Sequence, residues 1–209
     1  TDDPVDLMED VTIEFDFAGG GGKLISKQDG VVTLDQDLDD CIKNEYHWFY
    51  WNFKATSKTD RTVTFEFKWE RSIGDGGVLY STDGDKTWDY LGLKSRQKFT
   101  FDLKAGQTVH FSCALPYQLA DLNSWLNELE KNDLVTINRT FSETNAVLKT
   151  TGEKASIPMI TLGNPDAPKY LIFTGRMHAC ETIASFTLEG VVNDFASLPA
   201  DDPFWDEYC

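Results

Sequence analysis

The sequence predicts two kinds of structure in one chain: an antiparallel β-sandwich over residues 1–115, followed by the truncated start of an α/β domain over residues 116–209. Three observations support this fold class. Apolar and polar residues alternate through the first half, the spacing changes to that of an amphipathic helix after residue 115, and strand, turn, strand, loop and helix signals then follow in order. The second part ends before a doubly wound sheet is complete, so we expect it to be the first portion of its domain.

Four runs with a period of two define the first half. Alternation of this kind places one face of each strand in a core and the other in water. Turn signals such as Gly19–Gly22 and Asp83–Gly84 separate the runs. Several short strands at this spacing predict a sandwich. The runs are Val11–Phe17, Val63–Trp69, Phe99–Leu103 and Val109–Cys113.

The segment Tyr46–Phe53 carries aromatic residues at both parities of a strand. Large apolar side chains on both faces are typical of a central strand that is buried on both sides. An exposed aromatic platform for a sugar or another ligand would have the same composition. The sandwich interpretation predicts that four aromatic side chains lie largely inside: Trp48, Tyr50, Phe65 and Phe67.

The second half begins with a helical pattern, in which four apolar residues have the i, i+3, i+4, i+7 spacing: Leu122, Trp125, Leu126 and Leu129. An apolar run from Ile157 to Leu162 and a Gly-Asn-Pro turn follow. The continuous apolar run Lys169–Thr174 then suits a parallel strand that is covered on both faces. The apolar side of a further helix is formed by Ile183, Phe186, Val191, Phe195 and Leu198.

Composition excludes several classes of partner. The chain has 35 acidic and 19 basic residues and a net charge of −16, which repels the phosphate backbone of nucleic acids. No apolar run approaches the ~20 residues of a membrane span, and no signal peptide is visible. Four widely spaced cysteines without a C-x-x-C pair fit reduced thiols, although one or two disulfides stay open. We therefore expect a protein that binds neither nucleic acid nor membrane, of unknown oligomeric state. We expect it in the cytoplasm, and a secreted or periplasmic location stays open as the alternative.

The segment Phe173–Thr182 is the most informative about chemistry because it contains His178 and Glu181. An imidazole and a carboxylate three residues apart can face one cation if the loop turns there, and zinc accepts both kinds of ligand. The position also fits an α/β sheet, in which ligands bind beyond the carboxyl ends of the strands. The alternative is that these residues bind no metal: the histidine lies on the surface, and the glutamate is stabilised by the positive end of a helix.

The stretch Lys169–Gly190 resembles the first metal-binding motif of zinc carboxypeptidases of the carboxypeptidase A type, where an apolar strand leads into Arg-x-His-x-x-Glu-Thr and a helix. Within that family the chain is most similar to the cytosolic carboxypeptidases and their bacterial relatives, which have a β-sandwich before the peptidase domain. Three further segments carry the resemblance: Asn44–Tyr50, Tyr80–Trp88 and Pro116–Leu122.

This resemblance implies a zinc metallocarboxypeptidase that hydrolyses C-terminal residues from peptides or proteins, with Zn²⁺ as cofactor and His178 and Glu181 as the first two zinc ligands. The family's third ligand, its substrate-carboxylate residues and its general base have no counterpart here. Ala179 and Cys180 also replace the usual Pro-Gly. No catalytic residue is therefore assigned within this chain, its substrate-binding residues are unknown, and we expect it to be inactive by itself.

Two other functions and several weaker motifs compete with this hypothesis. The chain could be a non-catalytic β-sandwich binding module or an inactive peptidase-like scaffold.

His47 and His110 lie in predicted strands and are not taken as the third ligand. Cys180 is either a soft ligand or a small buried residue. Asp35-x-Asp37-x-Asp39 imitates a calcium loop but lacks its glycine, which favours a solvated acidic loop. Ser81–Trp88 approaches an Asp-box turn but is predicted to be a plain hairpin.

Overall fold

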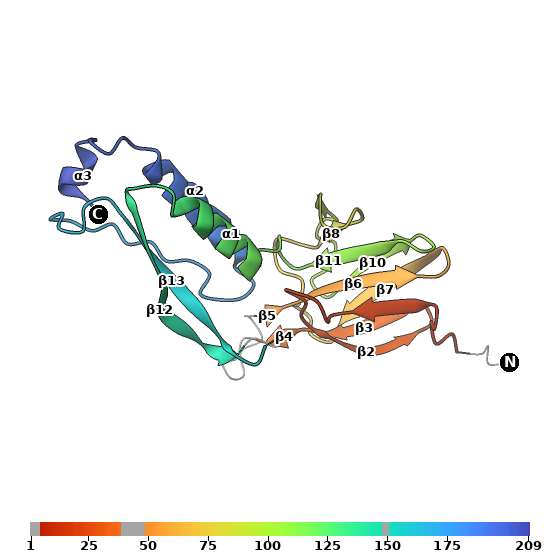
Figure 1. Cartoon of the computed structure of the whole chain (residues 1–209). Coiled ribbons are helices and arrows are strands. Elements are labelled where there is room, and N and C mark those ends of the chain that lie inside the picture. The colour runs from red at the N-terminus through yellow and green to blue at the C-terminus, as the bar shows by residue number, and fades with distance from the viewer. Residues whose placement is uncertain (1–4, 39–48, 148–150) are drawn as a thin grey trace. The chain divides into compact units, whose positions relative to one another are not determined.

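The computed structural model describes residues 5–38, 49–147 and 151–209 (Figure 1). The chain divides into two compact units. The first comprises the residues up to Pro116 together with His178–Cys180, and the second comprises Tyr117–Met177 and Glu181–Cys209. The predictions that concern Cys41, His47 and Trp48 fall outside the described residues.

Two sheets build the first unit. One sheet has the strand order β1-β6-β11-β8-β9, with β1 Val11–Glu14, β6 Asn52–Ser57, β11 Thr108–Ser112, β8 Leu79–Ser81 and β9 Asp89–Tyr90. The other has the order β10-β7-β3-β2, with β10 Lys98–Leu103, β7 Arg61–Phe67, β3 Val31–Asp35 and β2 Lys23–Gln28. A short pair joins β4 Asp37–Leu38 to β5 Phe49–Tyr50. The β8–β9 pair confirms the predicted hairpin at Tyr80–Trp88.

The core of the first unit is aromatic. Its largest fully buried side chains include Phe53 and Phe111 from one sheet and Phe65 and Phe67 from the other. The Phe53 and Phe65 ring centroids lie 5.3 Å apart, and those of Phe65 and Phe111 5.1 Å, so the inner faces of both sheets meet in one cluster. The predicted alternation is thereby explained, since residues of one parity in β7, β10 and β11 supply this cluster.

The described part of the aromatic segment behaves as a central strand. Trp51, Asn52 and Phe53 are all fully buried, and β6 lies between β1 and β11. The Trp51 indole nitrogen donates a 2.6 Å hydrogen bond to Ser72 O. Tyr50 is only half-buried and donates through its hydroxyl to Gly19 O. The prediction of buried side chains is therefore confirmed for Phe65 and Phe67, and Tyr50 lies at the margin of the core.

One strand pair departs from the predicted antiparallel arrangement: β3 and β7 are parallel, with Val32 opposite Phe65 and Leu34 opposite Phe67. The chain leaves the four-stranded sheet after β3, passes through β6 in the other sheet, and returns as β7. A hairpin forces antiparallel pairing, whereas a connection through another sheet allows either direction. The local alternation of residues carries no information about this choice.

The acidic segment Asp35–Asp37 also differs from its prediction as a solvated loop. Asp35 is 8% exposed, and its carboxylate accepts hydrogen bonds from the Trp69 indole and from Gln36 N. The Asp37 carboxylate accepts a hydrogen bond from Gly22 N. Both carboxylates therefore organise the chain around β3 and β4, while Asp39 lies outside the described residues.

The second unit contains helix α1 Leu119–Leu129, the long hairpin β12 Val135–Val147 and β13 Lys154–Leu162, helix α2 Thr182–Ala196 and the short α3 Phe204–Glu207 (Figure 1). The amphipathic pattern predicted α1 correctly, and Leu126 and Leu129 are its buried residues. At its start, the Asp121 carboxylate accepts a 2.7 Å hydrogen bond from Gln118 N, which satisfies a free helix-terminal donor.

Side-chain hydrogen bonds tie α1 to its neighbours within this unit. The Trp125 indole donates to Asn193 Oδ1 on α2, and Asn132 Nδ2 donates to Ala196 O at the end of the same helix. Figure 1 shows the two helices running alongside each other. Within the described ranges, no helix has the length and apolarity needed to cross a bilayer.

The predicted fold class is confirmed: a sheet-rich region precedes a region in which helices and strands alternate. The strand β12 was not predicted. Its partner β13 corresponds to the predicted apolar run Ile157–Leu162, and the turn that follows has Gly163 at φ +80°.

Candidate metal centre

The segment Lys169–Thr174, predicted as a buried parallel strand, is not a strand in the structure. Only Lys169 forms a β-bridge, to Tyr208, supported by hydrogen bonds from Leu171 N to Cys209 O and from Cys209 N to Lys169 O, both 2.9 Å. Tyr170, Ile172 and Phe173 are 61%, 84% and 51% exposed. The prediction was wrong because a strand needs a neighbour along its length, and the described residues provide one only at its first positions.

The connection from this segment to α2 carries the predicted ligands. Gly175 packs directly against α2, since a Cβ added there would lie 2.7 Å from Leu188 Cδ1. Arg176 follows with φ +55°, an uncommon conformation for a residue other than glycine. His178 is half-buried in the turn, and Glu181 occupies the N-cap position of α2. A carboxylate at this end of a helix is favoured by the helix dipole.

The two predicted ligands fall on opposite sides of the division between the compact units, His178 with the first and Glu181 with the second. The prediction that their side chains converge on one point therefore stays a prediction. Thr182, the first residue of α2, is 1% exposed, and its hydroxyl has no hydrogen-bond partner in the part of the chain that the structure describes.

The chemistry of the two donors can be compared with what zinc requires. A neutral imidazole and a carboxylate are both common zinc ligands, so the pair fits in kind. A catalytic site needs three protein ligands and an open position. Among residues 5–38, 49–147 and 151–209, however, no three His, Cys, Asp or Glu side chains gather in an arrangement that could hold a metal ion. His178 and Glu181 are thus suitable types of zinc ligand, but they are one ligand fewer than a catalytic zinc site needs.

Tyr117, helix α2 and Arg176 contact one another within the second unit. The Tyr117 hydroxyl donates a 2.5 Å hydrogen bond to Glu189 Oε1 on α2, and the Tyr117 ring lies edge-on to Phe186, with centroids 5.1 Å apart. Arg176 Nη1 donates a 2.5 Å hydrogen bond to Tyr117 O. Burial and the hydrogen bond to the Glu189 carboxylate raise the pKa of the Tyr117 hydroxyl, so it remains a donor at neutral pH.

His110 is excluded as a ligand by its own hydrogen bonds. It lies on β11 and is 3% exposed, as the predicted strand position implied. Its Nδ1 donates to Asp85 Oδ1, and its Nε2 contacts Asn52 Oδ1. Burial lowers the pKa of His110, and the Asp85 carboxylate opposes that shift. Both ring nitrogens are therefore already used inside the first unit.

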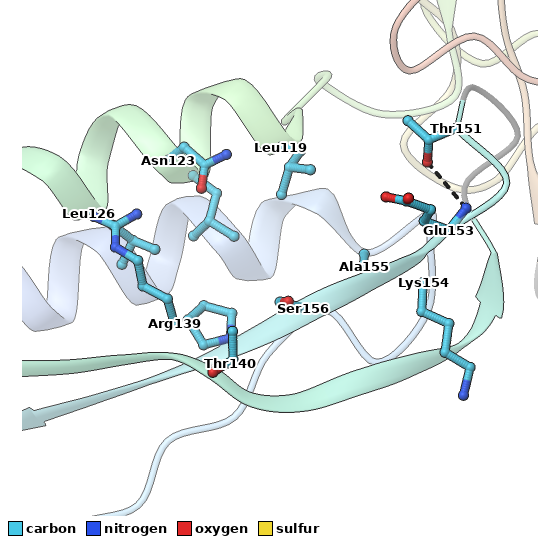
Figure 2. Close-up of a pocket in the computed structure, with 12 residues that line it drawn as sticks. Leu119, Asn123, Leu126, Arg139, Thr140, Thr151, Glu153, Lys154, Ala155 and Ser156 are labelled. Carbon is cyan, nitrogen blue, oxygen red and sulfur yellow. Dashed lines mark hydrogen bonds between the residues drawn. The ribbon is translucent and has the colours of Figure 1, made fainter.

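A groove elsewhere in the second unit contains none of the predicted ligands. It has a volume of about 410 Å³ and lies between α1 and the β12–β13 hairpin, where Figure 2 shows Leu119, Asn123 and Leu126 facing the strands. Arg139 reaches from β12 toward α1, where Nε and Nη2 donate to the Glu130 carboxylate at 2.9 and 2.8 Å. This groove is separate from the candidate metal centre.

Comparison with known proteins relates the sequence to one class of enzyme. No protein-family profile matches the chain. Cytosolic carboxypeptidase 6 of Caenorhabditis elegans is 23% identical over 222 residues, which cover 93% of this chain and 46% of the relative.

Solved structures with a similar fold are metallo-carboxypeptidases. One from Burkholderia cenocepacia has a TM-score of 0.67 at 18% identity, covering 95% of this chain and 54% of that one. One from Pseudomonas aeruginosa, in complex with (2-guanidinoethylmercapto)succinic acid, has a TM-score of 0.67 at 16% identity, with coverage of 94% and 53%.

The chain resembles the metallo-carboxypeptidases. The resemblance inferred from the sequence is thus confirmed, in sequence by the cytosolic carboxypeptidase and in fold by the solved structures. The chain spans about half the length of the relatives it matches.

The sequence did not predict the roles of Tyr117 and Glu189 next to the motif. Both positions have ordinary polar or aromatic residues, and 72 residues separate them. The only sequence signal was the resemblance of Pro116–Leu122 to a family segment, which assigns no contact.

Proposed function

We propose that this chain is part of a cytoplasmic zinc metallocarboxypeptidase that releases C-terminal residues from peptides or proteins, with His178 and Glu181 as two of its zinc ligands. One observation carries the proposal: Arg176-x-His178-x-x-Glu181-Thr182 lies directly before α2 in a chain that resembles metallo-carboxypeptidases. The position of the motif directly before a helix, in a chain with this fold, favours a metal-binding role over a chance spacing.

The roles of the chain's own residues follow from their chemistry. His178 would bind through a neutral ring nitrogen and Glu181 through its carboxylate. A zinc ion held by these residues and a third ligand would supply Lewis acidity, which activates a water molecule and polarises a carbonyl group. Because two ligands do not complete a catalytic site, we propose that the third ligand and the general base lie outside these 209 residues. We also propose residues 1–115 as a β-sandwich domain and 116–209 as the first part of the peptidase domain.

The proposal is tested by expressing the complete reading frame that encodes this chain. That protein should release single residues from peptide C-termini, and a chelator should stop the reaction. His178→Ala removes one of three ligands, so zinc content and turnover should fall together. Glu181→Gln keeps the shape but loses the charge, and should weaken zinc binding less. Glu153→Gln, an exposed carboxylate away from the motif, is the matched control and should change neither.

The 209-residue chain provides a second control. It has the same two donors without a third ligand or base, and should show no hydrolysis even in excess zinc. Full activity in His178→Ala would contradict the metal assignment.

An inactive peptidase-like scaffold is the second candidate, because no three metal-binding side chains gather in the described ranges. The scaffold hypothesis predicts one of two results for the complete protein. Either it binds zinc only weakly, or it binds zinc stoichiometrically but cleaves no member of a peptide library with varied C-terminal residues. A non-catalytic binding module would give the same result in the zinc-binding and peptide-cleavage assays. In addition, residues 1–115 expressed alone would still bind its ligand.

A further inference from the structure

We propose that Tyr117 and Arg176 are positioning residues, which hold both ends of the Met177–Glu181 loop and so orient the side chains of His178 and Glu181. The proposal rests on the proposed function, since it concerns the same two ligands. It assigns no direct contact with metal or substrate to either residue.

The entry to the loop is held against α2. Gly175 lies close to α2, because an added Cβ would come within 2.7 Å of Leu188 Cδ1 and 3.3 Å of Ala184 Cβ. The next residue, Arg176, extends back to the start of α1, where its guanidinium donates to Tyr117 O and lies 6.0 Å from the centre of the Tyr117 ring. The chain therefore enters the loop from a fixed position.

The exit of the loop is held by the same group of residues. Glu181 occupies the N-cap position of α2, and Phe186 and Glu189 lie about one and two turns further along that helix. Tyr117 contacts both, through its ring and through its hydroxyl. One tyrosine thus binds the residue before the loop through its carbonyl oxygen and the helix after the loop through its side chain.

The backbone of Arg176 indicates that this arrangement has a local cost. A residue with a Cβ at φ +55° is strained, and such strain persists only where surrounding contacts determine the conformation. Glycine would relieve the strain, but it would lose the hydrogen bond to Tyr117 O. The strained position nevertheless has Arg176, whereas glycine stands at position 175. This choice is expected if the Arg176 guanidinium is needed for the hydrogen bond to Tyr117 O.

The test uses the 209-residue chain, with amide hydrogen exchange measured in the metal-free protein and Zn²⁺ affinity measured by competition with a chromophoric chelator. Arg176→Met keeps the side-chain length and removes the donor. It should speed exchange at residues 177–181 while the interior of α1 is unchanged, and weaken Zn²⁺ binding about tenfold, the lower end for residues that orient metal ligands. Arg176→Lys, which keeps one donor, should recover part of both effects.

Tyr117→Phe should give a smaller change in the same direction, because it removes only the bond to Glu189. Arg139→Met removes another hydrogen-bonded arginine of the second unit and should change neither measurement. The proposal is overturned if Arg176→Met leaves exchange at 177–181 unchanged, or if exchange rises equally throughout the second unit, which would indicate a general structural role.

Failure of the proposed function gives a different result. If the wild-type chain and His178→Ala bind Zn²⁺ equally, the metal assignment fails. The exchange data still decide whether Tyr117 and Arg176 hold the loop.

Discussion

The two units of the chain differ in where one prominent group of apolar side chains lies. In the first unit, Trp51, Phe53, Phe65 and Phe111 are completely buried between two sheets. In the second unit, the continuous apolar run Tyr170–Phe173 is 43–84% exposed. The same kind of residue is therefore core in one unit and surface in the other, which shows that burial depends on the neighbours a segment finds.

The exposed run Tyr170–Phe173 gives the second unit an apolar surface segment. Exposed apolar stretches of this kind mark surfaces that another structure covers. The run has a β-bridge only at Lys169, and the chain spans about half the length of its relatives. We propose that segments outside these 209 residues pair with it, whereas the first unit already has a closed core.

The largest expected effect is a loss of core packing in the first unit. Phe53→Ala should reduce the free energy of unfolding by about 3–5 kcal/mol, because it leaves a cavity among four aromatic rings. Phe173→Ala, a phenylalanine of the exposed run, should cost about 1 kcal/mol or less. Urea denaturation of both variants checks the contrast, and equal losses would refute it.

A medium effect is expected from two tyrosine hydroxyls in the second unit. Tyr117→Phe removes a hydrogen bond from a buried hydroxyl to a carboxylate, and should cost about 1.5–2 kcal/mol of unfolding free energy. Tyr170→Phe removes a hydrogen bond from an exposed hydroxyl to Pro165 O and should change stability by less than about 0.5 kcal/mol. Thermal unfolding compares the pair, and a larger effect at Tyr170 would contradict the assignment of burial.

A smaller effect concerns the β8–β9 hairpin of the first unit. Hydrogen bonds from Thr87 and Lys86 N–H groups and from the Thr87 and Ser81 hydroxyls lower the pKa of the exposed Asp83 carboxyl to about 2. A depressed pKa means that this stabilisation is present above pH 3.8 and is lost as the pH falls toward 2. An NMR titration should give a midpoint near 2, and Asp83→Asn should remove this part of the pH dependence. A midpoint near 3.8 would exclude these bonds in solution.

The smallest effect is expected at Ile172, which is 84% exposed. Ile172→Glu should leave the unfolding free energy within about 0.5 kcal/mol of the wild type, because the side chain already lies in water. It should also reduce any self-association of the chain, measured by sedimentation. A large destabilisation would mean that the run is buried in solution and would remove the contrast between the units.

Local patterns predicted much of the secondary structure and failed where pairing was decisive. The spacing of Leu122, Trp125, Leu126 and Leu129 correctly indicated α1, and alternation indicated β7, β10 and β11. The strand β12 was missed although Val135 and Ile137 alternate with polar residues, because Arg139 and Thr140 then interrupt the pattern in an exposed hairpin. The segment Lys169–Thr174 was assigned to a strand from composition alone, which carries no information about a partner.

The residues of the candidate site could be predicted from the sequence motif, but the tertiary contacts near them could not. His178 and Glu181 could be selected because imidazole and carboxylate groups have a known affinity for zinc at such spacing. The hydrogen bonds of Tyr117 with Arg176 and Glu189 could not be predicted, because they join positions 59 and 72 residues apart, one through a backbone carbonyl and the other through a side chain.

The sequence by itself determined the period of α1, β7, β10 and β11, the hairpin at Tyr80–Trp88, the aromatic composition of the core and the identity of the two metal-binding candidates. These properties depend on the chemistry of neighbouring residues, which the order of amino acids contains directly. The tertiary structure decided that β3 and β7 are parallel, that the run at Tyr170–Phe173 is exposed, and that Tyr117 is hydrogen-bonded to both Arg176 and Glu189. These outcomes depend on which distant segments meet, and a contact between distant segments follows from the packing of the whole chain rather than from any local pattern.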